Sequence, residues 1–260
     1  MKKLIFCDID DTIRPKDGEI SEFTIETIKK LKNKAEFVLV TGRNRERTEI
    51  FASAYGGCRY IIDANGGEVF DTIKREVIYS AKCTKDAVKQ LYELSKKYGV
   101  VLILNISADF RFVTEWTHKV EAEKKIEDID YVLDNYDVVG GLFLGIKDSD
   151  LASLKSEILE IEGLTIGNKG VTEGDNFVDF VSEYANKGVA VRKLMRHLGV
   201  AYENTFAVGD GINDVAMFSA TAHNVVVGNA CDEIKAMADI IVDTAKNDGP
   251  AKFFRDKFMK

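Results

Sequence analysis

The stretch FCDIDDTIRP, residues 6–15, decides the fold of this chain. Its three aspartates, Asp8, Asp10 and Asp11, come directly after the apolar run LIF at residues 4–6. A short, continuous apolar run is typical of a strand buried on both faces, as in a parallel sheet. Charge at the end of such a strand indicates a site, because ligands of open parallel sheets bind beyond the carboxyl ends of the strands.

The rest of the chain divides into two patterns. Residues 1–79 and 183–260 alternate strand-like and helix-like segments, which predicts a Rossmann-like α/β core with a parallel sheet. Residues 80–182 contain neighbouring strand patterns without a helix between them, which predicts an α+β domain inserted into that core. Within the insert, the charged stretch VEAEKKIEDI at residues 120–129 is expected to be helical.

Composition excludes some classes of function. The 260 residues carry a net charge of −7, which disfavours nucleic acid as a partner, because phosphate backbones attract basic surfaces. No apolar run approaches the roughly 20 residues of a membrane span, and no signal-peptide pattern opens the chain. The four cysteines are scattered, as in a protein with reduced thiols. We therefore expect a cytoplasmic protein with no membrane partner.

Three predicted strands of the core end in polar residues. Asp8 and Asp10 lie two positions apart, so they point to the same side if strand geometry persists. Two neighbouring carboxylates repel each other unless a cation lies between them. A further carboxylate, Asp210, follows a later strand, and a few carboxylate oxygens with open positions suit Mg²⁺. The sequence thus predicts a magnesium site at this edge of the sheet.

Other nucleotide, metal and thiol motifs fail. The chain has no GxxxxGK[ST] loop, and the GxG at residues 209–211 has Asp214 where a dinucleotide fingerprint needs a third glycine. Cys7 is followed by Ile13 where a cysteine phosphatase has arginine. The three histidines are isolated and form no zinc pattern: His118, His197 and His223.

Four short motifs together resemble one known family. DIDDT at 8–12, VTGR at 40–43, NKG at 186–188 and GDGINDVAM at 209–217 match, in order, the motifs of the haloacid dehalogenase-like (HAD) phosphohydrolases. GNA at 228–230 and NDG at 247–249 are similar to the Cof-like branch, which carries a large α/β cap (C2B type) between the second and third motifs. One departure is Asp11, which stands where the usual DxDGT has glycine.

The resemblance implies a catalytic set. Asp8 would be the nucleophile that forms an aspartyl-phosphate, and Asp10 would protonate the leaving alcohol and then deprotonate water. Lys187 would neutralise the nucleophile and the phosphate. The implied metal ligands are the side chains of Asp8 and Asp210, the Asp10 backbone carbonyl, and Asp214, which binds Mg²⁺ directly or through water, or instead holds Lys187.

The remaining motif residues are expected at the phosphate. Thr41 and the Gly42 N–H, at the start of the next helix, would bind a phosphoryl oxygen. Asn213 would bind the phosphate or orient a neighbour. Arg43 and Asn65 lie at strand ends facing the same crevice, which makes them candidates for substrate contact. Within the cap, the candidates for contact with the leaving group are Arg111, Trp116, His118 and Lys119.

The predicted function is a Mg²⁺-dependent phosphatase of small phosphorylated metabolites, with sugar phosphates as the leading class. One alternative is a phosphotransferase or mutase of the phosphomannomutase type, because an aspartyl-phosphate can pass its phosphoryl group to a sugar hydroxyl. The other is a non-catalytic sugar-phosphate binding module. Against that module, a pure binder needs neither a nucleophile nor an acid two residues away.

Overall fold

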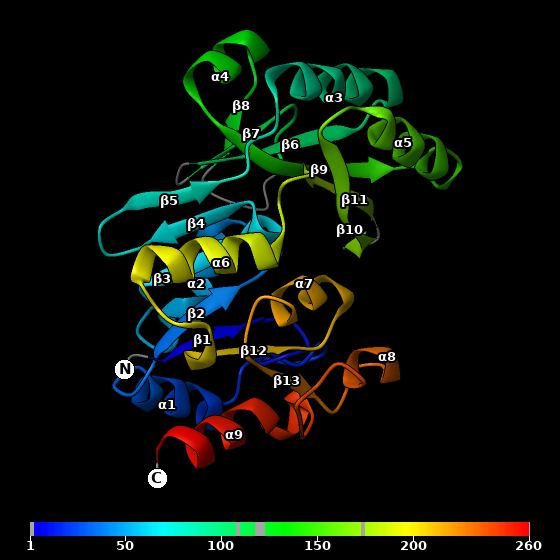
Figure 1. The fold of residues 1–260 in the computed structure, drawn as a ribbon. Helices are drawn as coiled ribbons and strands as arrows, with labels where there is room; N and C mark the ends of the chain where they lie inside the picture. The colour runs from blue at the N-terminus through cyan, green and yellow to red at the C-terminus, as the bar shows by residue number, and fades with distance from the viewer. Residues whose placement is uncertain (1–2, 108–109, 118–122, 173–174, 260) are drawn as a thin grey trace. The chain divides into compact units, whose positions relative to one another are not determined.

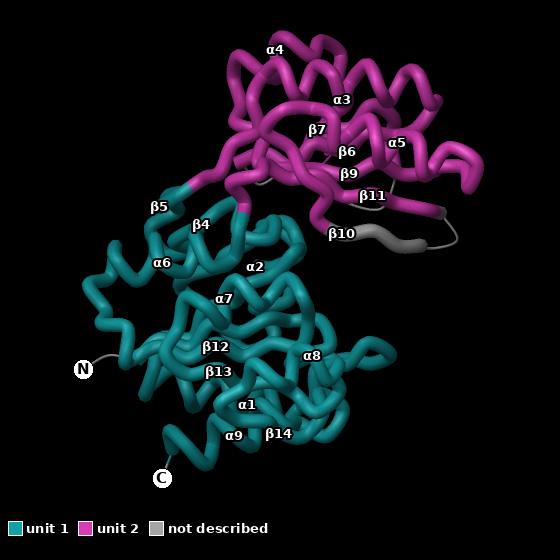
Figure 2. Tube along the Cα trace, turned by 45° about the vertical axis from the view of Figure 1, so that its right-hand side comes forward, with its two compact units in different colours: residues 1–79, 186–260 teal, residues 80–185 magenta. Residues whose placement is uncertain are grey.

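The computed structural model describes the chain except residues 1–2, 108–109, 118–122, 173–174 and 260. It divides into two compact units (Figure 2): residues 1–79 with 186–260 form unit 1, and residues 80–185 form unit 2. The chain therefore returns from unit 2 to unit 1 after residue 185. This agrees with local hydrogen bonds, since Glu183 N donates to Gly163 O and Ala185 N donates to Ser182 O, both within unit 2.

Unit 1 is built on an eight-stranded sheet of order β14-β13-β12-β1-β2-β3-β4-β5 (Figure 1). Neighbours from β14 to β3 pair in parallel, and β4 turns back antiparallel to β3. The strands are β1 (Leu4–Cys7), β2 (Glu36–Val40), β3 (Tyr60–Asp63), β4 (Glu68–Asp71), β5 (Glu76–Ser80), β12 (Thr205–Gly209), β13 (His223–Val227) and β14 (Ile240–Val242). The predicted parallel-sheet α/β class is confirmed.

Helices cover both faces of this sheet, because the central strands are apolar on both sides. Along β1, Leu4 and Phe6 pack in one core with α6, α7 and α8, while Ile5 and Cys7 pack in the other with α1, α2 and α9. The helices of unit 1 are α1 (Glu22–Leu31), α2 (Arg45–Ser53), α6 (Lys187–Leu198), α7 (Val215–Phe218), α8 (Asp232–Lys235) and α9 (Gly249–Phe258). Short 3₁₀ turns lie at η1 (Ala64–Gly66), η2 (Tyr202–Asn204), η3 (Ile212–Asp214) and η4 (Ala245–Asn247).

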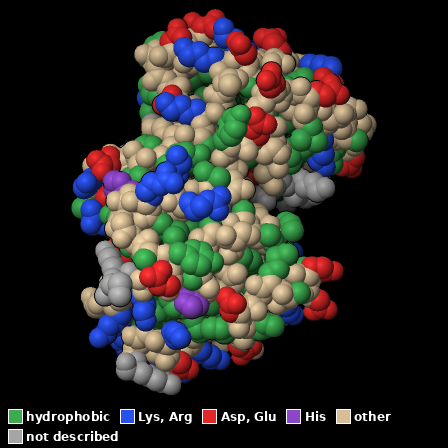
Figure 3. Space-filling model, in the orientation of Figure 1, with side chains coloured by type: hydrophobic (Ala, Val, Ile, Leu, Met, Phe, Trp, Pro, Cys, Tyr) green, Lys and Arg blue, Asp and Glu red, His purple; other side chains and the backbone are tan. Residues whose placement is uncertain are grey.

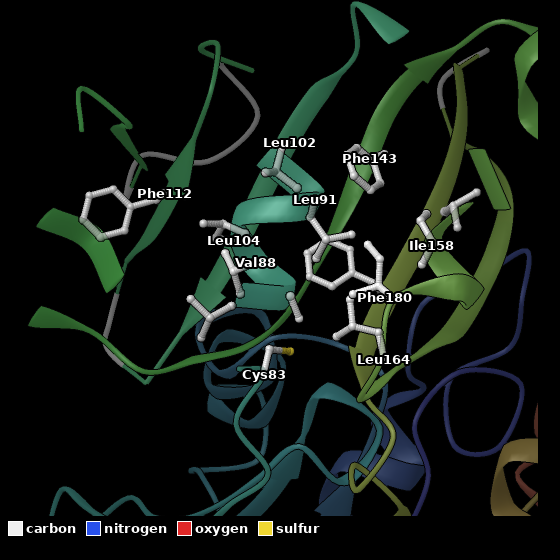
Figure 4. Close-up of a cluster of buried hydrophobic side chains, with 14 of the residues drawn as sticks. Cys83, Val88, Leu91, Leu102, Leu104, Phe112, Phe143, Ile158, Leu164 and Phe180 are labelled. Carbon is white, nitrogen blue, oxygen red and sulfur yellow. The ribbon is translucent and has the colours of Figure 1, made fainter. Parts of the chain in front are cut away.

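Unit 2 is an α+β unit with its own core. Its six-stranded sheet has the order β10-β11-β9-β6-β7-β8, and its neighbours are antiparallel except β7 and β8. Side chains from α3, α5 and the sheet meet in the apolar cluster of Figure 4, where Leu91 and Phe180 face each other. The elements are α3 (Lys85–Tyr98), β6 (Val101–Ile106), β7 (Arg111–Val113), β8 (Glu123–Lys125), α4 (Ile129–Asn135), β9 (Val138–Ile146), α5 (Asp148–Glu160), β10 (Leu164–Thr172) and β11 (Asp175–Ser182).

The expected helix at residues 120–129 is wrong in the part that the structure describes. Residues Glu123–Lys125 form strand β8 beside β7, and α4 begins only at Ile129, with the Asp128 side chain as its N-cap. The Glu123 carboxylate accepts a hydrogen bond from Arg111 at 2.8 Å, and both side chains are buried. This buried pairing outweighs the helix propensity of the charged residues. Residues 120–122 lie outside the described parts.

Charges of both signs are interspersed on the face of the molecule drawn in Figure 3. None of the helices in the described parts of the chain is long and apolar enough to cross a bilayer.

Candidate active site

Three adjacent strands deliver the predicted motif residues to one edge of the core sheet. Asp8 follows β1, Thr41 follows β2, and Asp210 follows β12, and the sheet order places β1 between the other two. Backbone pairing continues just past the strands, since Asp8 N donates to Val208 O at 2.9 Å and Thr41 N donates to Ile62 O at 2.8 Å. The carboxyl ends of these parallel strands therefore form one platform.

Lys187 lies at the centre of this platform. It is the first residue of α6, which begins where the Asn186 side chain accepts hydrogen bonds from Gly188 N and Val189 N. The Lys187 Nζ lies 2.7 Å from Asp8 Oδ1 and 2.7 Å from Asp214 Oδ1, and the lysine is only 1% exposed. Burial lowers the pKa of Lys187, but the carboxylates of Asp214 and Asp8 outweigh it and hold that pKa above its ordinary value. The ammonium stays charged.

Asp214 holds this lysine in place. Its Oδ1 accepts from Lys187, and its Oδ2 accepts from the backbone N–H groups of Asp210 and Gly211 at 3.0 and 3.1 Å. A Cβ on Gly209 would lie 2.4 Å from Asp214 Oδ2, so the close approach of this carboxylate requires glycine. Of the alternatives that the sequence leaves open for Asp214, the structure shows the contact with the lysine.

An acidic cluster surrounds the lysine. Within the described parts of the chain, Asp8, Asp210 and Asp214 each offer a carboxylate oxygen, and these oxygens lie within 4.8 Å of one another. The Thr12 hydroxyl lies between two of these side chains, 3.0 Å from Asp210 Oδ1 and 3.3 Å from Asp8 Oδ2. These oxygens are the hard ligands that divalent cations such as Mg²⁺ prefer, so the cluster fits the predicted metal.

Burial raises the pKa values of two carboxyl groups in this cluster. Burial raises the pKa of Asp8 to about 7, although Lys187 lowers it and Asp214 raises it further. Burial, together with the Asp214 charge, raises the pKa of Asp210 to about 6. Repulsion between these carboxylates is part of each shift, and a bound cation would relieve it.

Asp10 lies apart from this cluster. Its carboxylate accepts hydrogen bonds from Arg43 Nε at 2.9 Å, Arg43 Nη2 at 2.7 Å and Arg14 Nη1 at 3.1 Å. Partial burial raises the pKa of Asp10, but the Arg43 and Arg14 guanidinium groups outweigh it and lower that pKa below its ordinary value. Asp8 and Asp10 are expected to point to the same side if strand geometry persists. Strand β1 ends at Cys7, so strand geometry does not extend to these two residues.

The residues predicted to bind phosphate include Thr41 and Gly42 after β2 and Asn213 after β12, and Asn65, a predicted substrate contact, follows β3. Thr41 is buried, and its Oγ1 accepts from Arg43 N at 3.2 Å. Gly42 precedes α2 but does not cap it, because Asn44 is the N-cap. Asn65 adopts a left-handed backbone with φ 57°, and its Oδ1 accepts from Asn213 Nδ2 at 3.3 Å.

The four side chains predicted to touch the leaving group belong to unit 2. Arg111 is buried and donates to Glu123, so its guanidinium contributes to the interior of that unit. Trp116 is half exposed. His118 and Lys119 lie outside the described residues.

Sequence reasoning missed the contacts of two residues near the site. Arg14 is the second cation on Asp10, and the i, i+4 spacing of the two residues signals such a pair. Asn229, in the GNA motif, donates to the backbone carbonyl of Asp11. No local pattern predicts that contact, because the two residues are 218 positions apart.

Comparison with known proteins agrees with this geometry. The chain has an α/β core with a carboxylate–lysine centre, and the haloacid dehalogenase-like hydrolase family matches its residues 5–254. The chain belongs to this family. A 5-amino-6-(5-phospho-D-ribitylamino)uracil phosphatase of Bacillus subtilis (strain 168), YitU, is 26% identical across 98% of this chain and 97% of its own length.

Solved structures share the fold over nearly the full length. A haloacid dehalogenase-like hydrolase from Bacteroides thetaiotaomicron superposes with a TM-score of 0.84 at 25% identity, covering 99% of this chain and 100% of that one. A HAD subclass IIB sugar phosphatase superposes with a TM-score of 0.74 at 22% identity, covering 98% of each chain. The family and its phosphatase relatives identify this chain as a phosphoric monoester hydrolase of the Cof-like branch.

Proposed function

We propose that this phosphatase is Mg²⁺-dependent and hydrolyses small phosphorylated metabolites through an aspartyl-phosphate on Asp8. One observation carries the proposal: a buried lysine lies 2.7 Å from both Asp8 and Asp214, in a cluster with the carboxylate of Asp210. A lysine held in this way neutralises negative charge where an anionic substrate must meet an anionic nucleophile.

The proposed reaction has two displacements at phosphorus. An Asp8 carboxylate oxygen attacks phosphorus, the bond to the leaving oxygen breaks, and Asp10 gives that oxygen its proton. Water then attacks the phosphorus of the aspartyl-phosphate, Asp10 takes a proton from the water, and the bond to Asp8 breaks. Lys187 remains charged throughout, and Asp214 keeps it in place. Thr41, Gly42 and Asn213 would bind the phosphoryl oxygens.

The Asp8 and Asp210 side chains would hold the divalent cation, together with the Asp10 backbone carbonyl. Both oxygens of Asp214 already accept hydrogen bonds, so we assign Asp214 to Lys187 first. When bound, the cation would lower the pKa of Asp8 and neutralise phosphoryl charge.

For the substrate, we propose a phosphorylated sugar or polyol. The support is the relative YitU, whose name gives a phosphorylated ribityl compound as its substrate. We further propose that unit 2 supplies specificity, because it forms a separate folded unit between the second and third motifs. Arg43 and Asn65 are the proposed contacts from the core.

The test is release of inorganic phosphate from a panel of sugar and polyol phosphates, with and without Mg²⁺. We expect Asp8→Asn to keep the fold and to abolish turnover, and chelation of metal to do the same. Asp17→Asn is the matched control, because Asp17 is exposed in the same segment. Full activity of a pure Asp8→Asn protein, or undiminished turnover in EDTA, would show that the proposed chemistry is wrong.

A further inference from the structure

The GNA motif at residues 228–230 lies on the loop after β13 and has no role in the proposed chemistry. At Gly228 a Cβ would come within 3.1 Å of Val242 O and 3.3 Å of Thr244 N, so this loop passes very close to the end of β14. The next side chain, Asn229, reaches two backbone groups on different loops. Its Oδ1 accepts from Ala245 N at 2.8 Å, and its Nδ2 donates to Asp11 O at 2.8 Å.

The loop that Asn229 contacts carries much of the catalytic set. Asp11 lies between Asp10, the proposed acid and base, and Thr12, whose hydroxyl contacts Asp210 and Asp8. Asp11 has φ 60°, a left-handed conformation that non-glycine residues rarely adopt. A residue in that region persists only where its surroundings hold it there.

We propose that Asn229 is a positioning residue that holds the Asp11 carbonyl and so keeps the Asp10 loop in its catalytic conformation. The Asn229 amide oxygen accepts a hydrogen bond from Ala245 N, in turn η4, and its amide nitrogen donates a hydrogen bond to Asp11 O. It therefore ties the loop after β1 to a turn far along the chain. The inference rests on the proposed function, because it concerns the geometry of Asp10 in that reaction.

The proposal predicts a specific kinetic defect. A displaced Asp10 would protonate the leaving oxygen poorly, whereas attack by Asp8 would be less affected. The defect should therefore depend on the leaving group: large for an alkyl phosphate, whose alkoxide needs a proton, and small for p-nitrophenyl phosphate, whose phenolate leaves unaided. A general loss of folded protein would slow both substrates equally.

The experiment compares kcat/KM for glycerol phosphate and p-nitrophenyl phosphate, because this constant reports on the first displacement and not on the later hydrolysis. Asn229→Ala removes both contacts. Asn229→Asp keeps an acceptor for Ala245 N and removes only the donor to Asp11 O. For both variants we expect kcat/KM to fall about 10- to 100-fold with glycerol phosphate and no more than about 3-fold with p-nitrophenyl phosphate.

Asn247→Ala is the control, because Asn247 lies in the same turn as Ala245 but its side chain donates to Asp243. It should leave both constants unchanged. An equal loss with both substrates, or wild-type behaviour of Asn229→Asp, would overturn the proposal. If Asn229→Ala does not fold, Asn229→Asp decides the question alone. Wild-type protein that turns over neither ester, and no member of the sugar and polyol phosphate panel, would instead overturn the proposed function, and this inference with it.

Discussion

Replacing Lys187 by methionine tests the electrostatics of the site directly. The substitution keeps a long side chain but removes the ammonium that lies 2.7 Å from Asp8 and 2.7 Å from Asp214. Asp8 and Asp214 would then face each other in the interior, 6% and 0% exposed, without that cation. Breaking a buried ion pair by removing one partner destabilises a protein by about 3–5 kcal/mol. We expect a loss of that size near pH 7, together with loss of turnover.

The loss should also depend on pH. A carboxyl group whose pKa is raised by folding binds its proton more tightly in the folded state, so its stability contribution declines as pH rises toward the folded pKa. Burial raises the pKa of Asp8 to about 7 even with Lys187 lowering it. Wild-type protein therefore stops losing stability through Asp8 near that pH. Without the lysine the Asp8 pKa lies higher, and the decline continues.

The difference in free energy of unfolding between wild type and Lys187→Met should thus grow by about 1.4 kcal/mol per pH unit above pH 7. Urea denaturation in EDTA at roughly pH 6, 7 and 8 measures it. Lys30→Met, which replaces an exposed lysine on α1, is the matched control and should show no such growth. Adding Asp214→Asn to Lys187→Met should recover part of the loss. A difference that stays constant over this pH range would refute the assigned electrostatics.

Three further outcomes follow from the geometry. Burial and the Asp214 charge raise the pKa of Asp210 to about 6. In EDTA, Asp210→Asn should therefore become more stabilising as pH rises from about 4 to 6, by about 1–2 kcal/mol in the free energy of unfolding after allowance for solvent screening. Urea titration at each pH measures this change, and an effect that stays constant with pH would contradict it. Asp11→Gly should relieve a left-handed backbone and raise the free energy of unfolding by about 1 kcal/mol while turnover persists; a lower melting temperature would count against this reasoning. Gly188→Ala should lower the melting temperature, because its Cβ would lie 2.1 Å from Ala216 O; an unchanged temperature would disprove that packing.

Sequence patterns predicted the core sheet well, because its strands are buried on both faces. Each central strand reads as a continuous apolar run, and the helices between successive strands require parallel pairing. The prediction failed at Glu123–Lys125, where three charged residues form an edge strand. There the deciding contact is the Arg111–Glu123 pair between neighbouring strands, and no local periodicity encodes it.

The motifs predicted which side chains meet but not how they share their contacts. Asp8, Lys187, Asp210 and Asp214 come from three separate segments, and the fold brings them together. The sequence left open whether Asp214 serves a metal or the lysine. The contacts of Asp214 are decided by the turn after β12, where two backbone N–H groups and Lys187 all donate hydrogen bonds to its carboxylate. Such convergence is a property of the folded backbone and is not visible in residue spacing.

Asp8 and Asp10 show most clearly what spacing leaves undetermined. The two residues are separated only by Ile9, yet the fold places one beside a buried lysine and the other beside two arginines. Burial raises the pKa of Asp8, whereas the arginines lower that of Asp10. The proposed roles need the reverse order, an ionised nucleophile and a protonated acid. A bound cation at Asp8 would correct the first pKa, and an anionic substrate that draws Arg43 away from Asp10 would correct the second. The same ligands that the reaction needs would therefore also bring both carboxyl groups into their working protonation states.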